Sequence, residues 1–128
     1  MAENLKEKGT KTRAMLWGED PQVVGAKRRL EAFHPDLSNF LDEQLFGNIW
    51  TRPGLPTKIR SFITVSALMA MGRVPQLKQH MRGALNLGIT VDELKELILH
   101  LSQYSGVPTA MEAVRCLMEL VAEDEQKK

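Results

Sequence analysis

RSFITVSALMAMGRVPQLKQHMRGALNLG, residues 60–88, is the stretch that decides the fold. Its first half is apolar on nearly every side, which predicts a helix that its neighbours bury. Gly72 interrupts the pattern, and Pro75 then suits the first position of a second helix, which Gly88 closes. Helical spacing along this second helix predicts a core stripe made of Leu77, Met81, Ala84, Leu85 and Gly88.

His80 lies on the flank of that stripe, with Gln76 one turn before it. An imidazole at the edge of an apolar face can be half buried and still reach a cavity. Because imidazole titrates near neutral pH, it is suited to moving protons. His80 is therefore the leading candidate for a functional residue, and a structural histidine is the alternative.

The rest of the chain also shows helical periods and no strand-like alternation of useful length, which predicts an all-α fold. Thr90 and Glu93 are spaced as a capping box at the start of one helix. Further helices are expected over 21–34, 36–47, 56–71, 90–105 and 108–122. The side chains expected to face inward include Val23, Ala26, Leu30 and Phe33, then Leu37, Phe40, Leu41 and Leu45, and finally Ala110, Val114, Leu117, Met118 and Val121.

Length and composition indicate one globular domain over residues 1–128, with 1–12 and 123–128 expected to be frayed. No apolar run is long enough to cross a bilayer, so a membrane protein is not expected. The net charge of +1 argues against a nucleic-acid binder. Cys116 is the only cysteine, which fits a reducing compartment, and we expect the protein in the cytoplasm. No cluster of His, Cys or Asp has metal-ligand spacing.

Several motifs together resemble the carboxymuconolactone decarboxylase family. They are WTRPGL from Trp50, Arg60, HMRGALNLGIT from His80, Glu93 with Glu96, and YSGVPTAMEA from Tyr104. The match runs from about Arg13 to Arg115. The resemblance implies an alkylhydroperoxidase D-like domain of about six helices that assembles as a homo-oligomer, a trimer or a hexamer.

The family has two chemistries. One branch removes carbon dioxide from γ-carboxymuconolactone in aromatic degradation, in the protocatechuate pathway, without metal or organic cofactor. The other, similar to alkylhydroperoxidase D, carries a CxxC motif ending four residues before the shared histidine. Here Arg73 and Gln76 stand at those two positions, so the thiol pair is missing and the decarboxylase branch is indicated.

The resemblance makes His80 the general acid/base of a cofactor-free lyase, acting on this lactone or a related lactone or β-keto acid. Arg52 and Arg60 are candidates to bind substrate carboxylates, or else structural arginines that tie the Trp50 loop to a helix end. Trp50 is a pocket wall or a packing anchor. Tyr104 either donates a hydrogen bond to an oxyanion or closes a helix end.

Gln76 stands where the decarboxylase pattern usually has an acid. Glutamine keeps the hydrogen-bonding reach and loses the charge that would raise the proton affinity of the histidine. The alternative to an enzyme is therefore a non-catalytic helical oligomer or a ligand-binding relative that has kept the scaffold.

Overall fold

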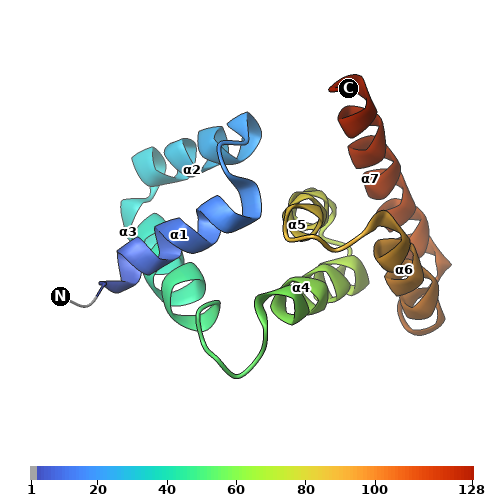
Figure 1. Ribbon diagram of the computed structural model, residues 1–128, viewed down its shortest axis with the longest axis horizontal. Helices are drawn as coiled ribbons and strands as arrows, with labels where there is room; N and C mark the ends of the chain where they lie inside the picture. The colour runs from blue at the N-terminus through green and yellow to red at the C-terminus, as the bar shows by residue number, and fades with distance from the viewer. Residues whose placement is uncertain (1–2) are drawn as a thin grey trace. The chain divides into compact units, whose positions relative to one another are not determined.

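The computed structural model describes residues 3–128 and confirms the all-α class (Figure 1). Over these residues the elements are seven α-helices and one π-helix, and none of them is a strand. The chain forms two compact units, one ending at Thr57 and the other running from Lys58 to Lys128. The single domain over residues 1–128 stays a prediction. Among the described helices, none is long and apolar enough to cross a membrane.

The first unit begins with a helix where the sequence suggested a frayed leader. Helix α1 spans Leu5–Trp17, because the Asn4 side chain accepts a hydrogen bond from the Glu7 amide at 2.8 Å and caps it. Gly9 and Thr12 of α1 are buried. The prediction of fraying was therefore wrong for residues 5–12, and its part on residues 1–2 lies outside the described residues.

Helix α1 packs on a π-helix, η1, which spans Leu41–Ile49. Both helices use glycine at the contact. A Cβ atom on Gly9 would lie 1.9 Å from the Asp42 carbonyl oxygen, and one on Gly47 would lie 2.1 Å from the Leu5 carbonyl oxygen. Gly47 was expected to close a helix, and this was wrong: it lies inside η1, where it lets two backbones meet.

Helices α2 (Pro21–Phe33) and α3 (Pro35–Phe40) complete this unit and pack on one another. The inward face expected for α2 is not buried, since no residue of α2 is buried and Phe33 is 91% exposed. The same correction holds for the next helix, where Leu37, Phe40 and Leu45 are exposed. These short helices have neighbours on too few sides to cover their apolar residues.

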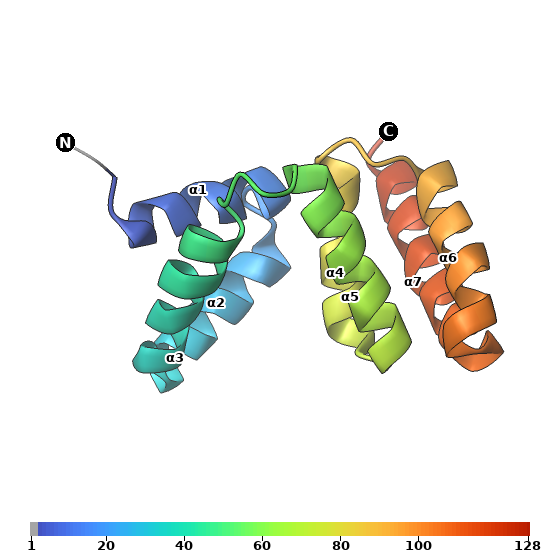
Figure 2. The ribbon, with the colours of Figure 1, turned by 90° about the horizontal axis from the view of Figure 1, so that it is seen from below.

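The second unit holds α4 (Thr57–Met71, of which Thr57 belongs to the first unit), α5 (Val74–Asn86), α6 (Val91–Ser105) and α7 (Val107–Gln126). Its core joins residues of all four helices, among them Val65, Met69, Leu77, Met81, Leu94, Leu97, Cys116 and Leu120. Figure 2 shows α6 and α7 side by side, and α7 also packs on α5. The capping box is confirmed: Thr90 Oγ1 accepts from the Glu93 amide at 3.0 Å, and Glu93 accepts from the Thr90 amide at 2.9 Å.

Two faces in this unit differ from the expectation. Helix α4 is not buried all round, because Ile59, Ile63 and Met71 are exposed. The face of α7 that packs on the core differs from the predicted one. Val114 and Met118, expected to face inward, are exposed. The buried residues are Ala110, Ala113, Cys116, Leu117 and Leu120. Helix α7 also continues to Gln126, so residues 123–126, expected to be frayed, are helical.

Candidate functional site

Helix α5 carries His80 and Gln76 one turn apart, as the sequence indicated. A turn at Gly72, with φ of +70°, separates α5 from α4. Leu77, Met81 and Ala84 face the core and are almost fully buried. His80 is half-buried on the flank of this stripe, and Gln76 is exposed. An imidazole in this position belongs to a fixed helix and keeps part of its surface accessible.

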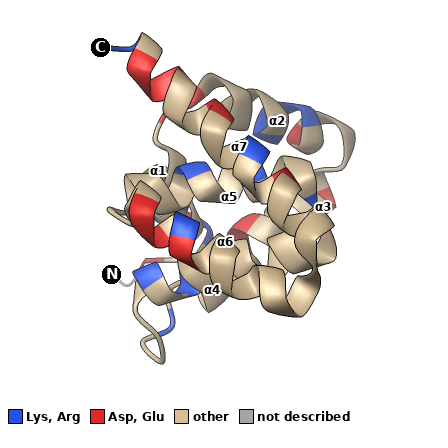
Figure 3. Ribbon diagram, turned by 90° about the vertical axis from the view of Figure 1, so that its right-hand side faces the viewer, with Lys and Arg blue, Asp and Glu red and all other residues tan. Residues whose placement is uncertain are grey.

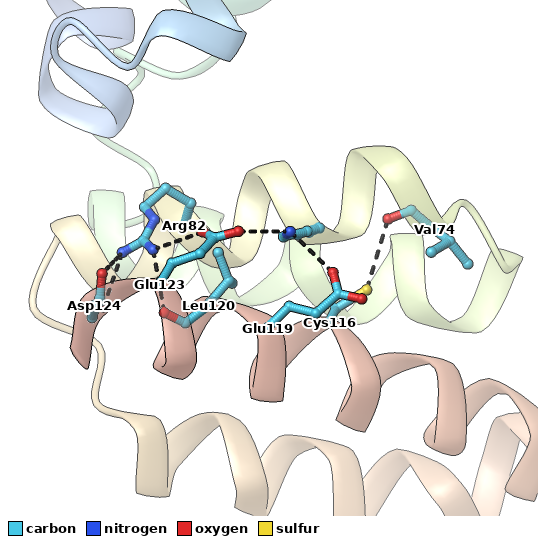
Figure 4. Close-up of polar contacts among 8 residues, drawn as sticks. Val74, Arg82, Cys116, Glu119, Leu120, Glu123 and Asp124 are labelled. Atoms are coloured by element: carbon cyan, nitrogen blue, oxygen red, sulfur yellow. Dashed lines mark hydrogen bonds and ion pairs between the residues drawn. The ribbon is translucent and has the colours of Figure 1, made fainter. Parts of the chain in front are cut away.

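Ion pairs with α7 hold the opposite flank of α5 (Figure 4). Lys78 Nζ lies 2.9 Å from Glu123 Oε1 and 3.0 Å from Glu119 Oε2. Arg82 pairs with Asp124 at 2.9 Å and with Glu123 at 3.4 Å. Figure 3 shows acidic residues gathered near the end of α7. This network explains why α7 is ordered there, and it fixes the helix that carries His80.

The ion pairs between α5 and α7 shift the pKa values of Glu123 and Arg82. The hydrogen bond from Lys78 holds the pKa of Glu123 below its ordinary value. The hydrogen bond to Asp124 is the main reason why the pKa of Arg82 is raised. A carboxylate whose pKa is lower in the folded state stabilises the fold above its unfolded pKa, and this contribution is lost as the pH falls through the lowered value.

We therefore expect the free energy of unfolding to fall on acidification, and to fall less in a Glu123→Gln variant. At neutral pH the variant should be less stable by about 0.5 kcal/mol, a small value because water screens a side chain that is 45% exposed. Urea unfolding at several pH values measures both effects. Glu96→Gln, an exposed position on α6 in the same unit, is the control. Equal pH dependence in the two variants would contradict the assignment.

Arg60 and Ser61 are consecutive residues of helix α4. Arg60 is half-buried. Ser61 is fully buried, and its hydroxyl oxygen has no hydrogen-bond partner among the residues that the structure describes. Buried hydroxyl groups are normally paired. Sequence reasoning missed Ser61, because one serine in an apolar run carries no signal beyond its place after Arg60.

Trp50 and Arg52 belong to the first unit. Trp50 follows η1 directly and is buried, with its ring stacked on Phe46 at 6.3 Å between centroids. The indole therefore packs within the first unit, and its role as a pocket wall or a packing anchor stays a prediction. Arg52 is exposed, and its amide donates to the Ile49 carbonyl at 3.2 Å.

Tyr104 lies near the end of α6 and is 78% exposed. Its ring contacts the His100 ring at 5.3 Å between centroids. Gly106, with φ of +96°, then turns the chain into α7. The structure thus brings Gln76 and His80 onto one helix, places Arg60 on α4 and Tyr104 on α6 of the same unit, and places Trp50 and Arg52 in the other unit.

The single thiol is buried. Cys116 is 2% exposed, and its Sγ lies 4.0 Å from the Val74 carbonyl oxygen. Burial raises the pKa of the Cys116 thiol, which disfavours the reactive thiolate. Within residues 3–128, no group of three or more His, Cys, Asp or Glu side chains lies together so that it could hold a metal ion. The absence of a cofactor stays a prediction.

Fold and site first define a class: an all-helical protein with one half-buried histidine on a core helix that carries no cysteine. Comparison with known proteins narrows the class. The family model described as carboxymuconolactone decarboxylase family matches residues 35–119. The chain therefore belongs to the carboxymuconolactone decarboxylase family.

Three similar proteins each cover between 78% and 97% of the chain. A 4-carboxymuconolactone decarboxylase from Acinetobacter baylyi is 39% identical over 118 residues, or 92% of this chain and 87% of that protein. A nitrosuccinic acid decarboxylase from Metarhizium robertsii is 31% identical over 128 residues, or 97% and 89%. An uncharacterised 15.0 kDa protein from Paracoccus denitrificans is 30% identical over 102 residues, or 78% and 76%. The resemblance and the prediction of a decarboxylase-like enzyme are confirmed.

Proposed function

We propose that this protein is a cofactor-free carboxy-lyase that acts on γ-carboxymuconolactone, or on a related lactone or β-keto acid, with His80 as general acid/base. The observation that carries the proposal is the half-buried His80 on a core helix, in a chain similar to two named decarboxylases. We further propose a place in aromatic degradation, in the protocatechuate pathway, and a cytoplasmic location.

The reaction requires only a few functions from the protein. Loss of carbon dioxide from the lactone leaves an electron pair that spreads through the ring alkene to the lactone carbonyl. The protein has to bind carboxylates, stabilise the enolate charge and deliver a proton to carbon. An imidazole can deliver that proton near neutral pH.

The substrates named for the two relatives share these needs. In nitrosuccinic acid, loss of the carboxylate beside the nitro group leaves an electron pair that the nitro group accepts. Both compounds also keep a second carboxylate, one carbon away from the reacting carbon. A proton donor and a cationic group for the retained carboxylate would therefore serve either compound.

The remaining candidates take roles of this kind in the proposal. Arg52 and Arg60 bind substrate carboxylates, because a guanidinium forms bidentate bonds to them. Gln76 donates or accepts a hydrogen bond beside His80. Trp50 forms a wall of the pocket, and Tyr104 donates to the developing oxyanion.

The second candidate function is a non-catalytic helical oligomer or ligand-binding relative. The observation in its favour is Gln76, which is exposed one turn before His80 and supplies no charge to it. Such a protein would bind the lactone without releasing carbon dioxide.

One experiment decides between these functions. Purified protein is mixed with γ-carboxymuconolactone, and separately with nitrosuccinic acid, with no metal or cofactor added. Carbon dioxide release is followed, together with binding by calorimetry. We expect turnover of the lactone. Binding without release of carbon dioxide would support the second candidate function. Carbon dioxide release from nitrosuccinic acid alone would show that the lactone is not the substrate.

We also propose that the protein is a homo-oligomer, a trimer or a hexamer. An apolar groove of about 710 Å³ runs between α6 and α7 and includes Leu99, Val107 and Met118, each more than half exposed. Lys95 and Glu125 are among its lining residues, so a second copy can meet it with opposite charges. Apolar surface of this kind marks contact sites.

Met118→Glu should shift the oligomer toward smaller species, because a charge would be buried at a contact between copies. Light scattering coupled to size-exclusion chromatography measures the mass against the 14.4 kDa chain. Gln126→Glu, at the end of the same helix, should leave the mass unchanged. A monomeric wild-type protein would contradict the proposed homo-oligomer.

A further inference from the structure

Asp42 is a buried charged residue, at a position where an apolar side chain of similar size could also pack. It lies in the first turn of η1 and is 2% exposed. Arg13 Nε donates to one of its oxygens at 2.8 Å, and Lys27 Nζ lies 3.5 Å from the other. Buried ion pairs often stabilise a fold no better than apolar residues of the same size. The pair therefore calls for another explanation.

Arg13 has a second contact, with an aromatic ring. Its guanidinium carbon lies 4.5 Å from the centroid of the Phe46 ring. Phe46 in turn stacks on Trp50 at 6.3 Å, with 27° between the ring planes, and meets the edge of Trp17 at 5.7 Å. Contacts thus run without interruption from a buried carboxylate to a candidate substrate-binding residue, all within the first unit.

The residues of this chain of contacts lie on one side of the π-helix. Asp42, Phe46 and Trp50 are spaced by four residues, and hydrogen bonds in a π-helix run from residue i+5 to residue i. The Trp50 amide donates to the Leu45 carbonyl in this pattern at 3.0 Å. Residues four apart then advance by slightly less than one turn, so they stay on one side. Thr12 Oγ1 of α1 donates to the Phe46 carbonyl at 2.9 Å and ties that side to α1.

We propose that Arg13 and Asp42 are positioning residues: the ion pair fixes the Phe46 ring, and through it the orientation of Trp50 and the loop that carries Arg52. The inference rests on the proposed function, in which Arg52 binds a substrate carboxylate. A planar guanidinium can bind a carboxylate at its edge and an aromatic ring at its face together, which a lysine cannot do.

The test is Arg13→Lys, which keeps the charge and loses the planar contact. Arg28→Lys is the matched control, an exposed arginine of α2 in the same unit. We expect Arg13→Lys to raise KM for γ-carboxymuconolactone about tenfold and to leave kcat within about twofold, because a displaced binding group weakens capture more than the chemical step. The control should match the wild type.

Fluorine NMR of protein labelled with fluorotryptophan supplies a readout that does not depend on turnover. The chain has two tryptophans, Trp17 and Trp50, and Trp17→Phe assigns the two signals. Arg13→Lys and Asp42→Asn should both shift the Trp50 signal, and Arg28→Lys should not.

The outcomes separate the two proposals. An unmoved Trp50 signal, or equal losses in kcat and kcat/KM with a lowered Tm, would overturn the positioning role. If the wild type releases no carbon dioxide, the proposed function fails, and the Trp50 signal alone decides the inference: a shift supports it and no shift overturns it.

Discussion

Replacing His80 by alanine is expected to lower carbon dioxide release from γ-carboxymuconolactone by about a hundredfold or more, since a positioned general acid contributes at least that factor. The imidazole is the group that the proposal assigns to delivering a proton to carbon after carbon dioxide has left. Without it, the proton has to come from water, which is neither held in place nor matched in acidity. Substrate binding should change much less, because the arginines are untouched.

Controls must separate chemistry from folding, because His80 is half-buried. His34→Asn removes another imidazole and keeps an acceptor for the Leu37 amide that His34 caps at 3.1 Å. It should leave turnover unchanged. His80→Gln retains bulk and hydrogen bonding if the alanine variant unfolds. A folded His80→Gln variant with wild-type turnover would show that His80 is structural.

Replacing Gly9 by alanine is expected to lower the free energy of unfolding by about 3 kcal/mol or more, because overpacking against rigid backbone is costly. The added Cβ would lie 1.9 Å from the Asp42 carbonyl oxygen, a backbone atom inside η1 that cannot turn aside. Helix propensity alone predicts the opposite sign, since alanine is favoured over glycine within a helix by about 1 kcal/mol. The sign of the change in the free energy of unfolding therefore distinguishes overpacking from helix propensity.

Gly25→Ala in α2 is the matched control. There the nearest atom to the added Cβ is Arg29 Nη1 at 3.2 Å, the far end of a flexible side chain. We expect this variant to gain about 0.5 kcal/mol, because only helix propensity acts. Urea unfolding followed by circular dichroism measures both changes. A Gly9→Ala variant as stable as Gly25→Ala would show that α1 and η1 are not in close contact.

The candidate site was only partly open to prediction. The three- and four-residue steps around His80 identified its helix, its flank and its half-burial, because these depend on local periodicity. Ser61 gave no such signal, since its unpaired hydroxyl depends on what covers it. For Trp50, the residue type is compatible with a pocket wall and with a packing anchor, and only the structure shows that its ring stacks on Phe46.

The sequence by itself determined the helical class, the Thr90 cap and the core positions Leu77, Met81 and Ala84 of α5, because caps and apolar periods act over one or two turns. It also determined the membership of the family, through the order and spacing of its motifs. Tertiary structure alone decided which faces are covered. Helices α2 and α4 have apolar sides that stay exposed, and α1 forms where a leader was expected. Periodicity shows that a face is apolar, but burial depends on which helix approaches it. At Gly9 and Gly47 that approach is set by the missing side chain of a residue whose partner lies more than thirty positions away.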